Sequence, residues 1–528
     1  MDSMSQRFNG YAFVHGRVRL LCLALLGVAF ALQATAELTQ VQVGGELRTR
    51  GRYYINAWQP GGRATRIPNE HLRGRPIGWR GTDSLFKWDS RGSDWTMYET
   101  CLLLNVKADF TDDVSAFIEL YDRFVWGTQF RSNYLTGEDR RGNGNVTMHQ
   151  GYVEMRQLLD KPLRLRVGRQ ELLFGRGWLV SNMLTPSQYI SHDAFRLTYD
   201  ANDLTVDAFA SKLAENTFQD DSDIDFYGVY GTYSGLDAVN LSLYWFFVRD
   251  ATEIPRFETT QLGRWVNTQL GYDYSSTKLH FLGTRLFGRS GGFDYDLELA
   301  YQFGDASHMG SLFRPVGSLF GDPSARYDHW AAELMIGYTF QDVAWQPRVY
   351  VHGVFFEGQD NRNISFWDWM NPFYRPKASV SFNRLFSDKN YMPTVNDNSW
   401  LSNFYQANIG LEVQPTPKLR LHAHVAKNWV HKPFDPPKSI RFGGRRIPVA
   451  PALSFWTDKG SNNIGWEVAA WARYVYSDNL WFLLYGNYLW AGSGLTDGAF
   501  MHFYGTEFSG GSSDKNAGYV FWMAVLEF

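Results

Sequence analysis

The stretch FDYDLELAYQFG, residues 293–304, decides the fold of this chain. Aromatic and leucine side chains occupy every second position from Phe293 to Phe303, and mainly Asp, Glu and Gln lie between them. Because successive side chains of a strand point to opposite faces, this period of two predicts a strand with one apolar and one polar face. Its aromatic residues lie at both ends, as in strands that cross a membrane. A half-buried strand of a soluble sandwich looks similar, so one strand does not settle the fold.

The spacing of all such stretches does settle it. Very short connections such as 111–113, 201–202 and 477–479 alternate along the chain with long segments such as 58–92 and 359–399. A closed outer-membrane barrel has this order, with tight turns in the periplasm and long loops outside the cell. We therefore predict an all-β transmembrane antiparallel barrel of about 18 strands, near residues 43–57, 95–109, 114–127, 146–158, 162–172, 193–200, 203–211, 226–235, 239–249, 279–289, 293–304, 328–341, 347–358, 400–414, 418–430, 463–476, 480–491 and 517–528. Segment 262–275 is ambiguous, because it fits either a hairpin within a loop or a replacement for strand 279–289.

Composition agrees with a barrel. Aromatic residues make up 17% of the chain, yet the mean hydropathy is −0.33. The chain after residue 36 has no run of 18 apolar residues, so helical membrane spans are excluded there. A lipid-facing wall around a watery interior explains both values.

Residues 1–36 read as a cleaved secretory signal. Arg17 and Arg19 precede a short apolar run that ends at Leu32, and Ala34-Thr35-Ala36 is a cleavage motif. An uncleaved anchor is the alternative. Removing this segment changes the formal charge from −3 to −5 and leaves Cys101 as the only cysteine, so no intrachain disulfide forms. We expect residues 37–528 to form a single barrel domain in the outer membrane of a Gram-negative bacterium.

The charged residues of the strands predict what lines the barrel. In the first strand Arg48, Arg50 and Arg52 share one face, and Leu47 and Tyr53 lie on the other. A charge that faces lipid at mid-membrane costs about 2–4 kcal/mol, so the three arginines are expected to face the lumen. The same alternation predicts lumen-facing positions for Arg123, Glu154, Arg156, Arg164, Arg166, Arg196, Glu298, Glu412, Glu467 and Arg473.

Arg169 breaks this phase. Strict alternation from Leu163 would direct it toward lipid, but Gly168 precedes it, and a glycine within a strand often marks a bulge. We predict a bulge near Gly168 that turns Arg169 inward. If the strand ends at this point instead, Arg169 faces water.

An interior lined by guanidinium groups favours a selective pore for anions, because arginine stays charged and binds carboxylates in a planar fork. The alternative is that these arginines only pair with carboxylates across the wall and stiffen it. The long segments 58–92 and 431–462 are also basic, and they could steer anions or only bind lipopolysaccharide phosphates. Because every expected periplasmic turn is short, any plug must come from outer loops that fold inward.

Other chemical signals are weak. Asp220, Asp221, Asp223 and Asp225 could hold calcium loosely, but a solvated loop explains them better, because the glycine and the final glutamate of a calcium loop are missing. His422 and His424 share a face without an evident third ligand, so we interpret them as lumen lining. The chain has no hydrolase elbow, phosphate loop or paired-cysteine zinc motif. We therefore expect no enzyme, no cofactor, no metal and no nucleic-acid partner, although a barrel enzyme or an adhesive barrel is not excluded by local spacing.

The run LRLRVGRQELLFGRGWLVSN at 163–182, followed by ISHDAFRL at 190–197, resembles the alginate export family of outer-membrane barrels. FDYDLELAYQFGD, PRVYVHGVFFEGQD and NIGWEVAAWARY extend the resemblance over most of the chain. It implies an eighteen-stranded monomer that passes an anionic polysaccharide outward through an arginine-lined constriction. The positions that it carries over are Arg166, Arg169, Arg176 and Arg196. Expected partners are outer-membrane lipid, lipopolysaccharide and periplasmic export components. An uptake porin for small anionic or sugar-like solutes is the alternative function.

Overall fold

The computed structural model describes residues 38–56, 65–66, 83–84, 94–126, 146–185, 187–215, 223–251, 265, 276–307, 322, 324–358, 365–371, 373–374, 380–394, 402–433, 438–442, 445–449, 455–496 and 516–528. The predicted signal at 1–36 lies outside these residues. Most of the basic segment 58–92 and parts of 431–462 lie outside them too.

All eighteen predicted strands are present, and their ends differ from the prediction by only a few residues. They are β1 (Gln40–Ile55), β4 (Trp95–Asp109), β5 (Val114–Val125), β6 (Thr147–Met155), β7 (Leu163–Gln170), β10 (His192–Ala201), β11 (Leu204–Ala214), β12 (Ile224–Leu236), β13 (Val239–Asp250), β14 (Thr277–Ser290), β15 (Phe293–Asp305), β16 (Arg326–Thr339), β17 (Arg348–Phe356), β18 (Phe404–Thr416), β19 (Leu419–Val430), β22 (Asn463–Val475), β23 (Leu480–Ala491) and β24 (Ala517–Glu527). Strand β14 is therefore not displaced by segment 262–275, of which only Trp265 is described.

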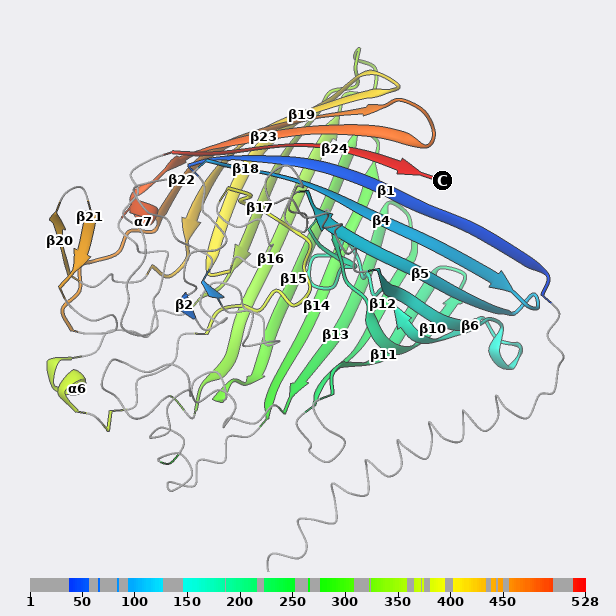
Figure 1. Cartoon of the computed structure of the whole chain (residues 1–528), viewed down its shortest axis with the longest axis horizontal. Coiled ribbons are helices and arrows are strands. Elements are labelled where there is room, and N and C mark those ends of the chain that lie inside the picture. The colour runs from blue at the N-terminus through cyan, green and yellow to red at the C-terminus, as the bar shows by residue number, and fades with distance from the viewer. Residues whose placement is uncertain are drawn as a thin grey trace, which may run out of the picture.

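The sheet closes on itself. Each of these strands pairs antiparallel with the next, and β1 pairs with both β4 and β24. The β1–β24 pairing runs from Glu46 opposite Glu527 to Ile55 opposite Gly518, and Figure 1 shows blue β1 beside red β24. A closed ring leaves no strand edge with unpaired backbone groups, which is what a sheet in lipid requires.

The two ends of the barrel differ. At one end the connections are short, as between β4 and β5 (110–113), β10 and β11 (202–203) or β22 and β23 (476–479). At the other end the connections are long, and they include the short hairpins β2 (Thr65–Arg66) with β3 (Asp83–Ser84) and β20 (Ser439–Phe442) with β21 (Arg445–Pro448). The helices α6 (Phe366–Met370) and α7 (Ser493–Thr496) also lie in long connections. No helix in the described part of the chain is long and apolar enough to span a membrane.

Side chains alternate between an exposed apolar outer face and a covered inner face. On β13, Leu243 is 59% exposed and Trp245 is 37% exposed, whereas Tyr244 and Phe246 are buried. The same contrast holds on β1, where Leu47 is exposed and the arginines are buried. A band of exposed apolar side chains around a closed sheet is a surface for lipid rather than for water.

Two long connections fold into the barrel. We name residues 171–191, without the undescribed residue 186, the first inner segment, and residues 380–394 the second inner segment. Val180 and Phe386 form a parallel bridge between the two segments. Trp178 of the first segment and Phe382 of the second are fully buried within one apolar cluster. The first inner segment also carries the short hairpin β8 (Met183–Thr185) and β9 (Gln188–Tyr189).

This cluster joins the inner segments to one side of the wall. Phe174 stacks on Phe209 of β11 and Tyr230 of β12, with ring centroids 5.3 and 5.2 Å apart. Phe382 meets Phe281 of β14 edge-on and Phe356 of β17 at a tilt, with ring centroids 5.6 and 5.7 Å apart. Buried aromatic rings contribute large apolar areas and specific ring contacts, so both segments are held firmly against β11–β17. The prediction that inserted segments come from the long connections is confirmed.

The prediction of a bulge at Gly168 is wrong. Strand β7 keeps an unbroken register with β6 and β10 through this residue, so Arg169 stays in phase with Leu163 and Val167 on the outer face. There it forms a two-pronged ion pair with Asp193, with both N–O distances at 2.8 Å. A glycine is needed at position 168 for another reason. Its φ is +128°, and a Cβ at this position would lie 2.3 Å from the carbonyl oxygen of Gly151. The bulge lies instead on β6.

Candidate functional site

Three arginines of the inner wall surround one carboxylate. Glu99 of β4 lies directly opposite Arg50 of β1 and is fully buried. Arg50 binds its Oε1 through Nε at 2.6 Å and Nη2 at 2.5 Å. Arg123 of β5 binds its Oε2 at 3.0 and 2.5 Å, and Arg52 lies 3.5 Å from the same oxygen. We call these four residues the Glu99 cluster.

The charged groups of the Glu99 cluster are mostly shielded from water. Three guanidinium groups share one carboxylate, and Arg50 is 1% exposed. Only Arg123 reaches solvent, with 23% of its side chain exposed. Arg50 and Arg52 therefore lie on the inner face but are covered, so they stabilise the wall through their ion pairs. Arg123 is partly exposed to the solvent of the lumen.

A second group of inner residues lies on β6 and β7. Glu154 accepts two hydrogen bonds from Arg166, at 3.1 and 2.6 Å, and one from Arg156 at 2.9 Å. The Arg166 guanidinium also lies 4.2 Å from the ring centre of Tyr152. Arg164 has the same inward phase, and no carboxylate among the described residues lies within ion-pair distance of it. Two guanidinium groups thus share Glu154 and a third is unmatched.

Arg176 belongs to the first inner segment and contacts the wall through two carboxylates. Its nitrogens lie 2.9 Å from Asp296 of β15 and 3.0 Å from Glu333 of β16. Arg285 of β14 shares Asp296 at 2.6 Å. Arg176 therefore anchors the inner segment.

The remaining predicted residues lie on the inner face, but in separate places. Arg48 pairs with Glu46 at 2.9 Å, and Tyr189 of the first inner segment donates to that same carboxylate at 2.9 Å. Arg196 pairs with Asp207 across β10 and β11 at 2.8 Å. Glu298 is buried and accepts a hydrogen bond from Tyr244 Oη. Glu467 is also buried, and the Arg473 guanidinium lies over the Trp481 ring.

The second inner segment adds a buried cation. Arg384 is fully buried, lies over the rings of Phe356 and Tyr391, and donates to Ser387 Oγ and the carbonyl oxygen of Lys389. Burial lowers the pKa of Arg384 to about 10, which leaves it charged at neutral pH. Burial also raises the pKa of Tyr391 well above its usual value, so this phenol stays neutral.

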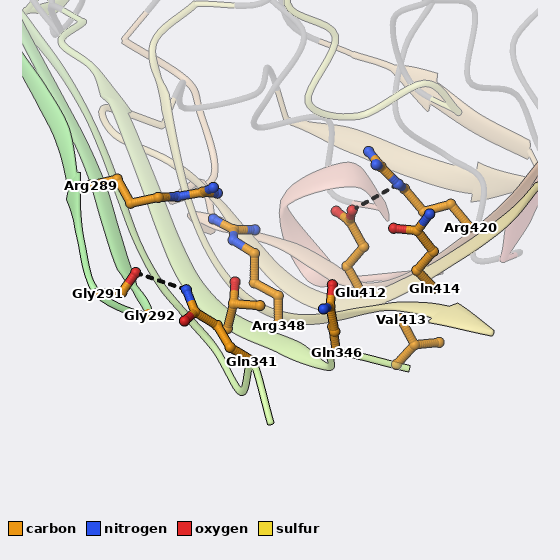
Figure 2. A pocket seen from close by; sticks show the side chains of 11 residues that line it. Arg289, Gly291, Gly292, Gln341, Gln346, Arg348, Glu412, Val413, Gln414 and Arg420 are labelled. Carbon is orange, nitrogen blue, oxygen red and sulfur yellow. Dashed lines mark hydrogen bonds and ion pairs between the residues drawn. The ribbon is translucent and has the colours of Figure 1, made fainter. Parts of the chain in front are cut away.

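A pocket of about 460 Å³ opens at the short-turn end of the barrel, and we call it the mouth pocket. Arg289 and Arg348 extend toward one another across it, and Arg420 lies on the far side beside Glu412 (Figure 2). The other polar side chains in its lining are Thr339, Gln341, Gln346 and Gln414.

The three arginines of the mouth pocket differ in how firmly they are held. Arg348 forms a two-pronged pair with Asp294, at 2.9 and 2.5 Å. Arg420 lies 3.4 Å from Glu412, with half of its side chain exposed. Arg289 has no ion pair with a described residue. The pocket therefore presents at least two guanidinium groups to an entering solute.

Sequence reasoning singled out Glu412 but missed Arg289, Arg348 and Arg420, although the same alternation places them inside. Glu99 was missed too, because nothing in its own strand marks it as the partner of three arginines on other strands.

Other residues that the sequence singled out have ordinary partners. Asp223 and Asp225 bind Lys212 at 2.6 and 2.9 Å, while Asp220 and Asp221 lie outside the described residues. His422 bonds to Tyr350 Oη at 2.7 Å and stacks on Trp471, as lumen lining would.

Comparison with known proteins identifies the family. The family model described as alginate export matches residues 82–492, and no curated protein matches. Among solved structures, the chain resembles OccK8 (OprE) of Pseudomonas aeruginosa with 11% identity, a TM-score of 0.48 and coverage of 92% of this chain and 98% of that one. It also resembles OccAB1 of Acinetobacter baumannii with 13% identity, a TM-score of 0.48 and coverage of 92% and 97%. These likenesses are too distant to transfer any property.

The closed barrel, its apolar outer face and the family match together place the protein in the outer membrane of a Gram-negative bacterium, and its family and fold are those of outer-membrane channels. The short-turn end is then the periplasmic end. Because the matching family model spans most of its length, this chain belongs to the alginate export family.

Proposed function

We propose that this barrel secretes an acidic, alginate-like polysaccharide from the periplasm to the cell exterior. The observation that carries this proposal is the set of solvent-exposed guanidinium groups on the inner face, which begins at the periplasmic mouth. Arg289 and Arg420 meet an entering polymer first, and Arg123 and Arg164 offer further positive charge along the wall. Membership of the alginate export family supports the same substrate class.

The chemistry suits repeated weak binding of carboxylates. A guanidinium group binds a carboxylate in a planar fork and keeps its charge at any working pH. Transport through a pore requires that each site binds well enough to admit the solute and weakly enough to release it. Partly paired arginines meet this need, because a neighbouring carboxylate such as Glu412 or Glu154 competes with the polymer for the same donors.

The inner segments narrow the path. They pack an apolar cluster against β11–β17. The first segment also reaches the charged side, through Tyr189 on Glu46 of β1 and Glu171 on His149 of β6, so an extended polymer would have to pass a narrow constriction. We expect the transport to be passive and independent of ATP. Lipopolysaccharide around a monomeric barrel and periplasmic export components are the partners we propose.

Uptake of small anionic solutes is the second candidate. The packing of the two inner segments favours it, because a narrowed lumen admits a small solute more readily than a long polymer.

Blocking of single-channel current by sugar oligomers separates the two candidates. We expect oligomers of uronic acids to interrupt the current at micromolar to millimolar concentration when added on the periplasmic side, and neutral oligomers of equal length not to do so. Residence times should lengthen with oligomer length if the polymer follows the wall. Equal block by acidic and neutral oligomers would contradict the proposal, and block by monomers alone would favour uptake.

A further inference from the structure

A bulge in β6 turns two consecutive side chains into the barrel. Glu119 of β5 pairs with Gln150, but the next residue, Leu120, pairs with Met148, so His149 is the extra residue. Both His149 and Gln150 are buried on the inner side. Bulges often redirect one side chain within a sheet, and here the redirected group is an imidazole.

The bulge brings His149 between two carboxylates. Its Nε2 lies 2.9 Å from Oε1 of Glu171 and 4.0 Å from Oε1 of Glu119. One donor atom from each of the three residues lies within 4.8 Å of the others. The three residues come from different places in the chain, because Glu171 is the first residue of the first inner segment.

Amide groups orient both carboxylates. Gln150 donates to Oε1 of Glu119 at 2.9 Å, and Asn182 donates to Oε2 of Glu171 at 2.8 Å. The backbone N–H of Glu171 in turn donates to Oε1 of Gln150 at 3.2 Å. Oriented carboxylates and a directed imidazole are the usual surroundings of a metal ion in a protein.

The two carboxylates of this group, Glu119 and Glu171, have no arginine or lysine partner among the described residues. Among the described residues, His149 is the only basic side chain within ion-pair distance of Glu119 or Glu171. Glu99 and Glu154 on the same side of the barrel are each bound by two or more arginines. A divalent cation would balance the two negative charges of Glu119 and Glu171.

We propose that Glu119, His149 and Glu171 bind a divalent transition-metal ion such as Zn²⁺. Two ligands of a tetrahedral zinc lie about 3.4 Å apart, which falls between the two observed separations from Nε2. A mixed set of one imidazole and two carboxylates suits zinc better than calcium or magnesium, which prefer oxygen ligands alone. Because Glu171 opens the first inner segment and the other two ligands belong to the wall, the ion would fasten that segment at its beginning.

Titration calorimetry with ZnCl₂ on the full-length barrel in detergent, after treatment with a chelator, tests the proposal. We expect saturable binding of one ion per chain. His149→Gln and Glu171→Gln should abolish it, and Asn182→Ala should weaken it about tenfold because it removes an orienting hydrogen bond. The matched control is the double variant His422→Gln/His424→Gln, which alters the other inward histidines and should bind as the wild type does.

A second measurement follows the inner segment itself. Zinc should slow amide hydrogen exchange of residues 171–185 in the wild type and leave it unchanged in the His149→Gln variant. If that variant fails to fold, Asn182→Ala decides the question through its weaker binding. The proposal is overturned if the wild type does not bind zinc, if binding survives both ligand substitutions, or if only the control double variant loses it.

Discussion

The Glu99 cluster and the mouth pocket place the same kind of side chain in opposite surroundings. In the cluster, Glu99 is fully buried and Arg50 nearly so, and three guanidinium groups hold one carboxylate. In the pocket, half of the Arg420 side chain is exposed and its contact with Glu412 is long. Charges interact strongly where water is excluded and weakly where water screens them. An inward arginine is thus buried in the wall's ion pairs in one place and open to solvent in the other.

The largest difference is expected in stability. Glu99→Gln should lower the free energy of unfolding by about 3–5 kcal/mol, because it leaves buried guanidinium groups without their counter-charge. Urea unfolding in detergent micelles, followed by tryptophan fluorescence, measures this. A loss below 1 kcal/mol would mean that the cluster does not hold the wall together.

Arg50→Lys tests the contact of two guanidinium nitrogens with the Glu99 carboxylate. Arg50 contacts Glu99 through two nitrogens, and a lysine offers a single ammonium group. We expect a loss of about 1.5–3 kcal/mol, the usual contribution of a hydrogen bond to a charged group. Arg420→Lys in the mouth pocket is the matched control and should leave stability unchanged within error. Equal effects of the two substitutions would erase the distinction between the regions.

The double variant Arg289→Glu/Arg420→Glu tests the open side of the comparison. Reversing two solvent-exposed charges at the entrance should slow the association of an acidic oligosaccharide about tenfold, since attraction of the ligand by the local field is lost. Rates of current block from the periplasmic side measure it, and stability should hardly change. In 1 M salt the difference should shrink, because the Debye length falls to about 3 Å. A difference that is independent of salt would contradict a steering role.

The smallest effect is expected from Glu412→Gln. The Glu412–Arg420 pair is partly exposed, and such pairs contribute about 0–1 kcal/mol, so unfolding should hardly shift. Removing the competing carboxylate should nevertheless lengthen the residence of an acidic oligosaccharide. Shorter residence times would show that Glu412 assists binding rather than competing with it.

The alternation of side chains was enough to predict the strands and the inner arginines. A strand has a fixed period of two, and lipid excludes charge, so residues such as Arg48 and Arg166 have only one side available. The same rule places Arg289, Arg348 and Arg420 inside, although these three were not predicted. For Arg169 only the alternation held, because this arginine lies on the outer face and pairs there with Asp193.

What the sequence could not supply are the contacts between distant segments. Gly168 reads as a bulge signal, but its conformation reflects the close approach of Gly151 on the neighbouring strand. The two inner segments meet at Val180 and Phe386, which are far apart in the chain and have no common local pattern. The grouping of Glu119, His149 and Glu171 likewise depends on a one-residue register shift that no propensity marks.

We expect the open guanidinium groups inside the barrel to stand in the conducting path. The reversal potential of single channels across a tenfold KCl gradient tests it most directly, with wild type, Arg289→Glu/Arg420→Glu and the outer-face control Arg169→Gln measured side by side. The account predicts that chloride is preferred by the wild type and the control, and that the double variant shifts clearly toward potassium. A wild type that prefers potassium, or a double variant with an unchanged reversal potential, would contradict it.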